Sequence, residues 1–139
     1  MAYMSQMSQD LKKSLTPKIK AICKKYGIKA TLAVRGGSTL VLNVSQGRID
    51  FIDNFNRTVG ASTWYTRNGF TPAKDHLDVN PYHFKDQFAG SALEFIKEVH
   101  AAMMKGNHDR SDMQSDYFDV GWYVDINIGK WNRPYALVK

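Results

Sequence analysis

Histidines beside aspartates are the first residues to consider for chemistry, because neutral imidazole is the commonest metal ligand among side chains. His76 and His83 lie seven residues apart, in a segment that also contains Asp75 and Asp78. Neither an HxH nor an HExxH spacing accompanies them. We therefore expect solvated loop histidines, and a metal-dependent enzyme built on these residues is the least favoured of three functional hypotheses.

Nucleophilic catalysis would require a serine, threonine or cysteine beside an oriented base, and no nucleophile-elbow sequence is present. Cys23 is the single cysteine, which excludes an intrachain disulfide. It falls on the apolar side of a helical pattern, so we expect a buried and unreactive thiol. Gly36-Gly37-Ser38 is too short for a phosphate-binding loop and predicts a hairpin turn.

Aspartates cluster near the C-terminus, but their spacing lacks the glycine and the closing glutamate of a calcium-binding loop. We expect a solvated face, with Lys29 or Arg35 as ion-pair partners across the sheet. The cluster consists of Asp109, Asp112, Asp116, Asp119 and Asp125. With no catalytic set in view, the sequence predicts a protein that is not an enzyme and holds no metal or cofactor.

The charge is unevenly distributed. The chain of 139 residues has a net charge of +6, and residues 1–60 hold ten Lys or Arg against three acids, whereas residues 61–139 hold nine against ten. Such a distribution is typical of a surface that meets a polyanion or an acidic protein, although lysine-rich helices also serve solubility alone.

The elements that must position these residues follow from hydrophobic periodicity. Helical spacing over residues 7–26 is interrupted by Pro17, so we expect Thr16 as N-cap, a main helix over 17–26, and a separate or kinked turn over 7–15. His100 falls at the boundary of a second helical pattern, over residues 86–105, and is expected to be packed there.

Alternating residues predict strands. Residues 28–34 and 40–44 form a hairpin around Gly36-Gly37, residues 118–128 form one long strand, and residues 135–138 add an edge strand. Residues 49–52 fit either a strand or the start of a helix. Residues 53–84 hold no sustained period and are expected either to be irregular or to contain short strands, for example around Trp64.

We therefore predict an α+β fold in which residues 1–139 form a single domain. Its antiparallel sheet consists of the hairpin plus the long C-terminal strand, with two main helices packed on one face. The chain has no apolar run of about 20 residues, its first ten residues are polar, and a single cysteine fits a reducing compartment. We expect no membrane insertion and a cytoplasmic location.

Candidate binding residues follow from this charge and from aromatic residues. Basic residues neutralise phosphates or steer acidic partners, and aromatic side chains stack on bases or anchor protein interfaces. The candidates are Lys13, Lys20, Lys24, Lys29, Arg35, Trp64, Tyr65, Lys130, Trp131 and Arg133.

Two stretches resemble a domain of bacteriophages and mobile elements. These are residues 15–44, a lysine-rich helix ending in Tyr26-Gly27 followed by the hairpin, and residues 111–135, with Asp116-Tyr117-Phe118-Asp119-Val120 and Ile126-Asn127-Ile128-Gly129-Lys130-Trp131. The chain thus resembles the large polyvalent-protein-associated domain of type 29, over about 60 residues, whereas residues 45–110 match only in the order of elements. The resemblance implies an accessory role in host takeover or anti-defence and carries over no active site.

Two hypotheses therefore lead. The first is a small phage or mobile-element protein that acts by binding, inhibiting a host defence protein or ribonucleoprotein complex of CRISPR or restriction type. The alternative is a nucleic-acid-binding module that contacts phage or host DNA or RNA through the basic N-terminal surface. The sequence does not indicate the oligomeric state.

Overall fold

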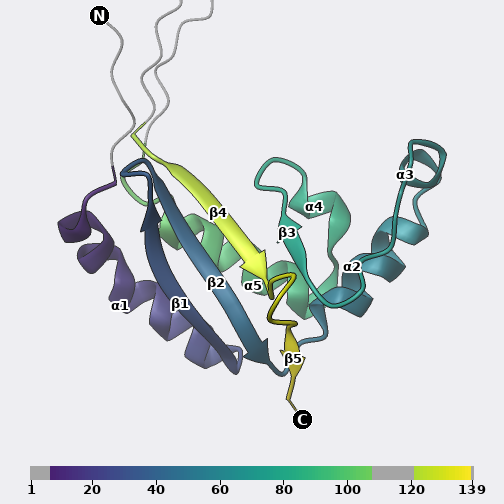
Figure 1. The fold of residues 1–139 in the computed structure, drawn as a ribbon, viewed down its shortest axis with the longest axis horizontal. Helices are drawn as coiled ribbons and strands as arrows, with labels where there is room; N and C mark the ends of the chain where they lie inside the picture. The colour runs from purple at the N-terminus through teal and green to yellow at the C-terminus, as the bar shows by residue number, and fades with distance from the viewer. Residues whose placement is uncertain (1–6, 108–120, 139) are drawn as a thin grey trace, which may run out of the picture.

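The computed structural model describes residues 7–107 and 121–138. Its helices are α1 (Gln9–Lys25), α2 (Phe51–Gly60), α3 (Thr63–Arg67), α4 (Phe84–Gln87) and α5 (Gly90–Met103). Its strands are β1 (Ile28–Arg35), β2 (Thr39–Gly47), β3 (Leu77–Val79), β4 (Tyr123–Ile128) and β5 (Ala136–Leu137). The α+β class and the single domain are as predicted (Figure 1).

One sheet organises the molecule, with strand order β1-β2-β4-β3 and β5 paired to the end of β2. The sheet is mixed, so the prediction of a purely antiparallel sheet is wrong. β1 pairs antiparallel with β2 and β3 antiparallel with β4, but β2 and β4 are parallel, with Leu42 opposite Ile126. A parallel pair needs a long crossover, and α2 to α5 provide it.

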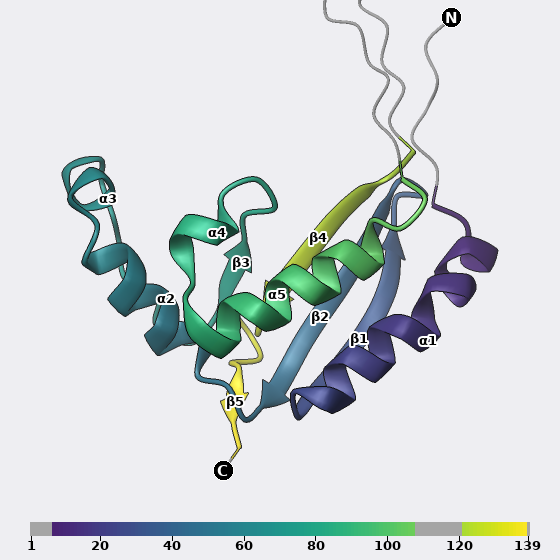
Figure 2. The same ribbon diagram turned by 180° about the vertical axis from the view of Figure 1, so that it is seen from behind.

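Helices α1 and α5 cover the same face of this sheet, as predicted, while none of the described helices lies on the opposite face of β1, β2 and β4 (Figure 1 and Figure 2). The core lies between the two helices and the strands. Its fully buried side chains include Ile19, Leu40, Leu42, Val44, Phe51, Phe88, Phe95, Ile96, Val99, Met103 and Ile128.

Helix α1 runs unbroken from Gln9, so the expected break before Pro17 is wrong. Ser8 is the N-cap, accepting a hydrogen bond from the Leu11 amide, and the Thr16 hydroxyl instead donates to the carbonyl of Lys12. Pro17 has no backbone N–H, so the Lys13 carbonyl receives no helical hydrogen bond from this position. Both residues are on the exposed side, where water can satisfy that carbonyl.

Residues 53–84 are irregular only in part, and the segment around Trp64 is the helix α3 rather than a strand. They contain the rest of α2, all of α3 and β3, and the first residue of α4. The ambiguous residues 49–52 lead into α2, which Asp50 caps by accepting from the Asp53 amide. These elements are short, so a search for sustained periodicity does not detect them.

The second predicted helix and the C-terminal strand also differ in extent. Residues 84–87 form α4, extended backbone at Phe88 and Ala89 follows, and α5 begins only at Gly90. β4 starts at Tyr123; residues 118–120 of the predicted strand lie outside the described residues. The hairpin turn is confirmed, with positive φ at Gly36 and Gly37, and β5 forms within the predicted 135–138 segment.

Asparagine side chains tie the segments outside the sheet to one another. Each of three asparagines donates to the carbonyl of a distant residue and accepts from the amide of that same residue, as a neighbouring strand would. The pairs are Asn54 with Ala89, Asn56 with Ala73 and Asn107 with Trp122, with N···O distances between 2.8 and 3.0 Å.

Candidate binding groove

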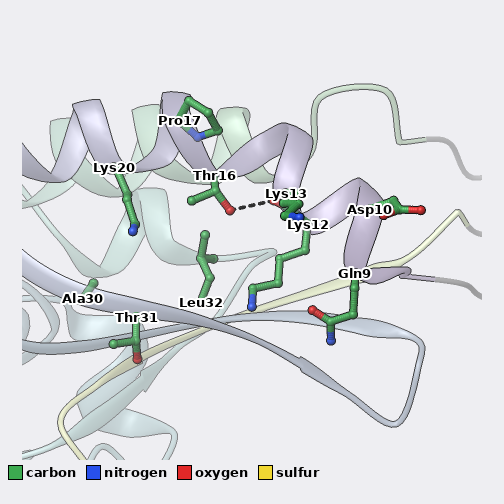
Figure 3. Close-up of a pocket in the computed structure, with 10 residues that line it drawn as sticks. All are labelled: Gln9, Asp10, Lys12, Lys13, Thr16, Pro17, Lys20, Ala30, Thr31 and Leu32. Atoms are coloured by element: carbon green, nitrogen blue, oxygen red, sulfur yellow. Dashed lines mark hydrogen bonds between the residues drawn. The ribbon is translucent and has the colours of Figure 1, made fainter.

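A groove runs between α1 and β1, the first strand of the sheet. One cavity of about 740 Å³ lies against the N-terminal half of α1 (Figure 3), and a second of about 350 Å³ continues along the same two elements. Lys20, Ala30 and Leu32 line both cavities, which therefore form one continuous α1–β1 groove.

The amphipathic pattern of α1 explains the lysines of the groove. Leu15, Ile19, Ile22 and Cys23 are buried, so the lysines occupy the remaining faces of the helix. In Figure 3 the side chains of Lys12 and Lys20 extend from α1 toward β1, while the carboxylate of Asp10 points away from the groove.

β1 forms the other wall, and one of its edges is open. Within the described residues it pairs with β2 alone. The carbonyl of Val44 accepts a hydrogen bond from the Gly129 amide on the side of β4, so Val44 and its partner Ala30 are a non-hydrogen-bonded pair across the hairpin. By alternation, the backbone N–H and C=O groups of Ala30, Leu32 and Val34 point outward from the sheet.

The electrostatics of the groove are one-sided. Asp10 is the single acid among its lining residues, against five lysines: Lys12, Lys13, Lys20, Lys24 and Lys29. None of the five forms an ion pair with a residue in the described part of the chain. Like charges lining a concave surface concentrate positive potential there and attract an anionic partner.

The neighbouring Lys25 is in a different situation. Its ammonium lies 3.0 Å from Glu98 of α5, and the hydroxyl of Tyr26 donates to the same carboxylate. Hydrogen bonds from Tyr26 and Lys25 lower the pKa of Glu98, and the bond to Glu98 raises the pKa of Tyr26 to about 12. Lys25 thus connects α1 to α5.

Three predicted cations, of which Lys29 also lines the groove, lie on the open face of the sheet or at its end. Lys29, Lys130 and Arg133 line a cavity of about 430 Å³ there, together with the polar side chains of Thr31, Asn43 and Ser45. We call it the sheet-face cavity. Trp131 is adjacent in sequence and 81% exposed. Arg35 lies at the opposite end of β1 and forms an ion pair with Asp125. Arg35 is thus one of the two cations that were expected to pair with this aspartate.

Trp64 and Tyr65 lie apart from these basic residues. They belong to α3, which protrudes on the side of the molecule opposite α1 (Figure 1). Their rings meet edge to face at 5.0 Å, and they border a separate cavity of about 500 Å³ with Ser62, His83 and Asp86. The structure therefore does not bring the aromatic candidates to the lysine groove.

Within the part of the chain that the structure describes, the residues considered for catalysis are not assembled; Asp109, Asp112, Asp116 and Asp119 of the predicted aspartate cluster lie outside it. His76 is exposed and bonded to its neighbour Asp75 at 2.7 Å, and no group of three metal-ligating side chains occurs among the described residues. Cys23 is buried as expected, and burial raises its pKa to about 11. His100 packs its ring against Phe84 at 5.2 Å, as predicted for a boundary position.

Two contributors to the groove were not predicted. Lys12 is in the segment that Pro17 was expected to separate from the helix. In one continuous helix, the spacing of Lys12, Lys20 and Lys24 places Lys12 on the same face as the other two lysines. The open edge of β1 depends on strand order, which the hydrophobic pattern of a strand does not reveal.

Comparison of the chain with protein-family models, with curated proteins and with solved structures gave no match. Within the described residues, no helix has both the length and the apolar character needed to cross a membrane.

Proposed function

We propose that this protein is a non-enzymatic accessory protein of a bacteriophage or mobile element that binds an acidic partner through the α1–β1 groove. Its target is a host defence complex of CRISPR or restriction type in the bacterial cytoplasm, which it inhibits. The observation that carries the proposal is the concave surface with five lysines that no described acid neutralises.

The sign of the charge favours an acidic protein surface as the contact. Defence complexes that hold guide or target nucleic acid do so in positive grooves, and those grooves repel Lys13, Lys20 and Lys24. Complementary potentials across an interface raise the association rate and exclude wrong partners. An acidic patch on a subunit of such a complex has the chemistry that this groove would recognise.

A nucleic-acid-binding function is the second candidate, and the sheet-face cavity favours it. Lys29, Lys130 and Arg133 surround a polar hollow, and the neighbouring Trp131 is exposed for stacking. This function predicts an affinity that falls linearly with salt on a log–log scale, with a slope set by the number of phosphates contacted. Binding insensitive to salt would exclude it.

Co-purification of the tagged protein from its bacterial host, with and without nuclease, tests the proposal. We expect a stoichiometric host complex that resists nuclease. A variant with Lys13→Glu, Lys20→Glu and Lys24→Glu is expected to lose it. The matched control reverses three exposed lysines elsewhere, at Lys74, Lys97 and Lys105, and should retain the complex.

Other outcomes contradict the proposal. Loss of every partner after nuclease treatment would support the nucleic-acid function instead. Equal loss of the complex in both triple variants would mean that net charge, rather than the groove, determines binding.

A further inference from the structure

We propose that the α1–β1 groove holds an extended acidic segment of the partner protein, which adds to the sheet as a new edge strand beside β1. This inference rests on the proposed function and specifies how the partner is bound. In this binding mode the backbone of β1 supplies hydrogen bonds and the lysines of the groove supply charge.

The edge of β1 is long, and no described strand pairs with its centre. Natural edge strands are usually blocked by charged side chains, proline or bulges, because free N–H and C=O groups accept any other strand. In β1 these devices occur at the ends: a bulge between Lys29 and Ala30, and a cation at Arg35. Arg35 is held by Asp125 over the open face of the sheet and does not block the edge.

Between these ends the outward backbone groups belong to Ala30, Leu32 and Val34. Ala30 and Leu32 line the groove, and all three side chains are half-buried against the core. An added strand would form hydrogen bonds along one of its edges with the outward N–H and C=O groups of these three residues. Helix α1 would lie beside the added strand. Strand addition of this kind supplies affinity through main-chain hydrogen bonds and specificity through alternate side chains.

The lysines determine the character of that segment. Alternate side chains of an added strand turn toward opposite faces of the sheet. One set would meet Lys12 and Lys20, which extend from α1 toward β1, and the other would pass near Lys29. Acidic residues on the segment therefore meet lysines on either face.

A peptide fits the groove better than a nucleic acid does. Single-stranded nucleic acids are held by aromatic side chains that stack on successive bases. None of the residues lining the groove is aromatic; its floor consists of Ile19, Cys23, Ile28, Ala30, Leu32 and Leu42. An aliphatic floor beside free backbone donors and acceptors suits an extended polypeptide.

A backbone-methylated peptide series tests the inference with the full-length protein. The parent probe is an eight-residue peptide of alternating valine and glutamate with blocked ends. Two derivatives carry N-methyl groups on either all valines or all glutamates, so that each blocks one edge of the strand and leaves charge and side chains unchanged. A fourth peptide has lysine in place of glutamate.

We expect the parent to bind and one methylated derivative to lose at least ~10-fold in affinity, because several main-chain hydrogen bonds of about 1 kcal/mol each disappear. The other derivative should stay within about threefold of the parent, and the lysine peptide should not bind. Lys20→Glu should weaken the parent, whereas Lys97→Glu should not. Failure of the parent to bind, or equal behaviour of both methylated derivatives, would overturn strand addition.

The outcomes separate this inference from the proposed function. If the host complex depends on Lys13, Lys20 and Lys24 but the peptides show no edge dependence, strand addition is wrong and the proposed function stands. If the peptides behave as expected and no lysine-dependent host complex exists, the edge site stands and the proposed function is wrong.

Discussion

Arg35 of β1 reaches across β2 to Asp125 of β4, and its Nη1 donates to Asp125 Oδ2 at 2.8 Å. The two residues lie on strands that are not neighbours, and the guanidinium lies over the open face of the sheet. The pair removes Arg35 from the group of unpaired cations, in contrast to the lysines of the α1–β1 groove.

Replacing Arg35 is therefore expected to have little effect. Both side chains of the pair are partly exposed, and such ion pairs contribute roughly 0–1 kcal/mol. We expect Arg35→Ala to change the free energy of unfolding by less than about 1 kcal/mol in urea denaturation. Recovery of the host complex should fall less than with Lys20→Ala. A larger loss with Arg35→Ala would place the binding surface on the sheet face.

The sequence predicted the elements that have a strong period. The hairpin and the two main helices follow from local patterns of side chains, and so does the burial of Cys23. The direction of the β2–β4 pair was missed because alternation in a strand is the same for parallel and antiparallel neighbours. The weight given to Pro17 was too great, because α1 continues through it and the Lys13 carbonyl that loses its partner is on the exposed side of the helix.

The candidate site was predicted only in part. Lys13, Lys20, Lys24 and Lys29 do line the groove, because one helix and the strand that follows it carry them. The sequence did not predict that Trp64 and Tyr65 lie on the far side. Their position depends on α2 and on the asparagine contacts, which leave no periodic signal.

Asn56 is expected to be important for stability. Its amide group donates to and accepts from the backbone of Ala73 at 2.8 Å, and Asn56→Ala leaves both backbone groups without a partner. The expected cost is about 1–3 kcal/mol in the free energy of unfolding. Asn68 is the control, because it is exposed and donates a single bond to the carbonyl of Trp64. Equal costs for the two variants would contradict this account.

Gly129 should tolerate substitution less than Gly37, although both have φ near +69°. A Cβ at Gly37 meets nothing within 4 Å, so Gly37→Ala incurs only the conformational penalty of about 1–2 kcal/mol. A Cβ at Gly129 would lie 2.5 Å from the backbone nitrogen of Tyr135 and displace the chain leading into β5. We expect Gly129→Ala to cost at least ~2 kcal/mol more in thermal or urea unfolding.

The thiol of Cys23 should react slowly in the folded protein. Burial is the main cause that raises its pKa to about 11, so little thiolate exists at pH 8. We expect modification by a disulfide reagent to be more than ~100-fold slower in buffer than in denaturing urea. Similar rates in the two solutions would show that α1 opens readily from the core.

His100 predicts how stability depends on pH. Burial against Phe84, together with repulsion from Lys85, lowers the pKa of this histidine below its ordinary value of 6.5. At pH values between the pKa of His100 in the folded protein and its pKa in the unfolded chain, the unfolded chain binds more protons than the folded protein does. Protonation therefore favours unfolding in this range. The contribution of His100 is therefore complete above pH 6.5 and is lost as the pH falls through 6.5 toward the folded pKa.

Urea denaturation between pH 7.5 and about pH 5 should show this loss in the wild-type protein. His100→Gln removes the titrating group and is expected to flatten the curve in that range. His76→Gln is the control, since His76 is exposed beside Asp75. The carboxylate of Glu98, whose pKa is lowered by Tyr26 and Lys25, affects stability only below about pH 4.5 and does not overlap the window. An unchanged slope in His100→Gln would mean that another group carries the pH dependence and that the ring of His100 is solvated in the folded protein.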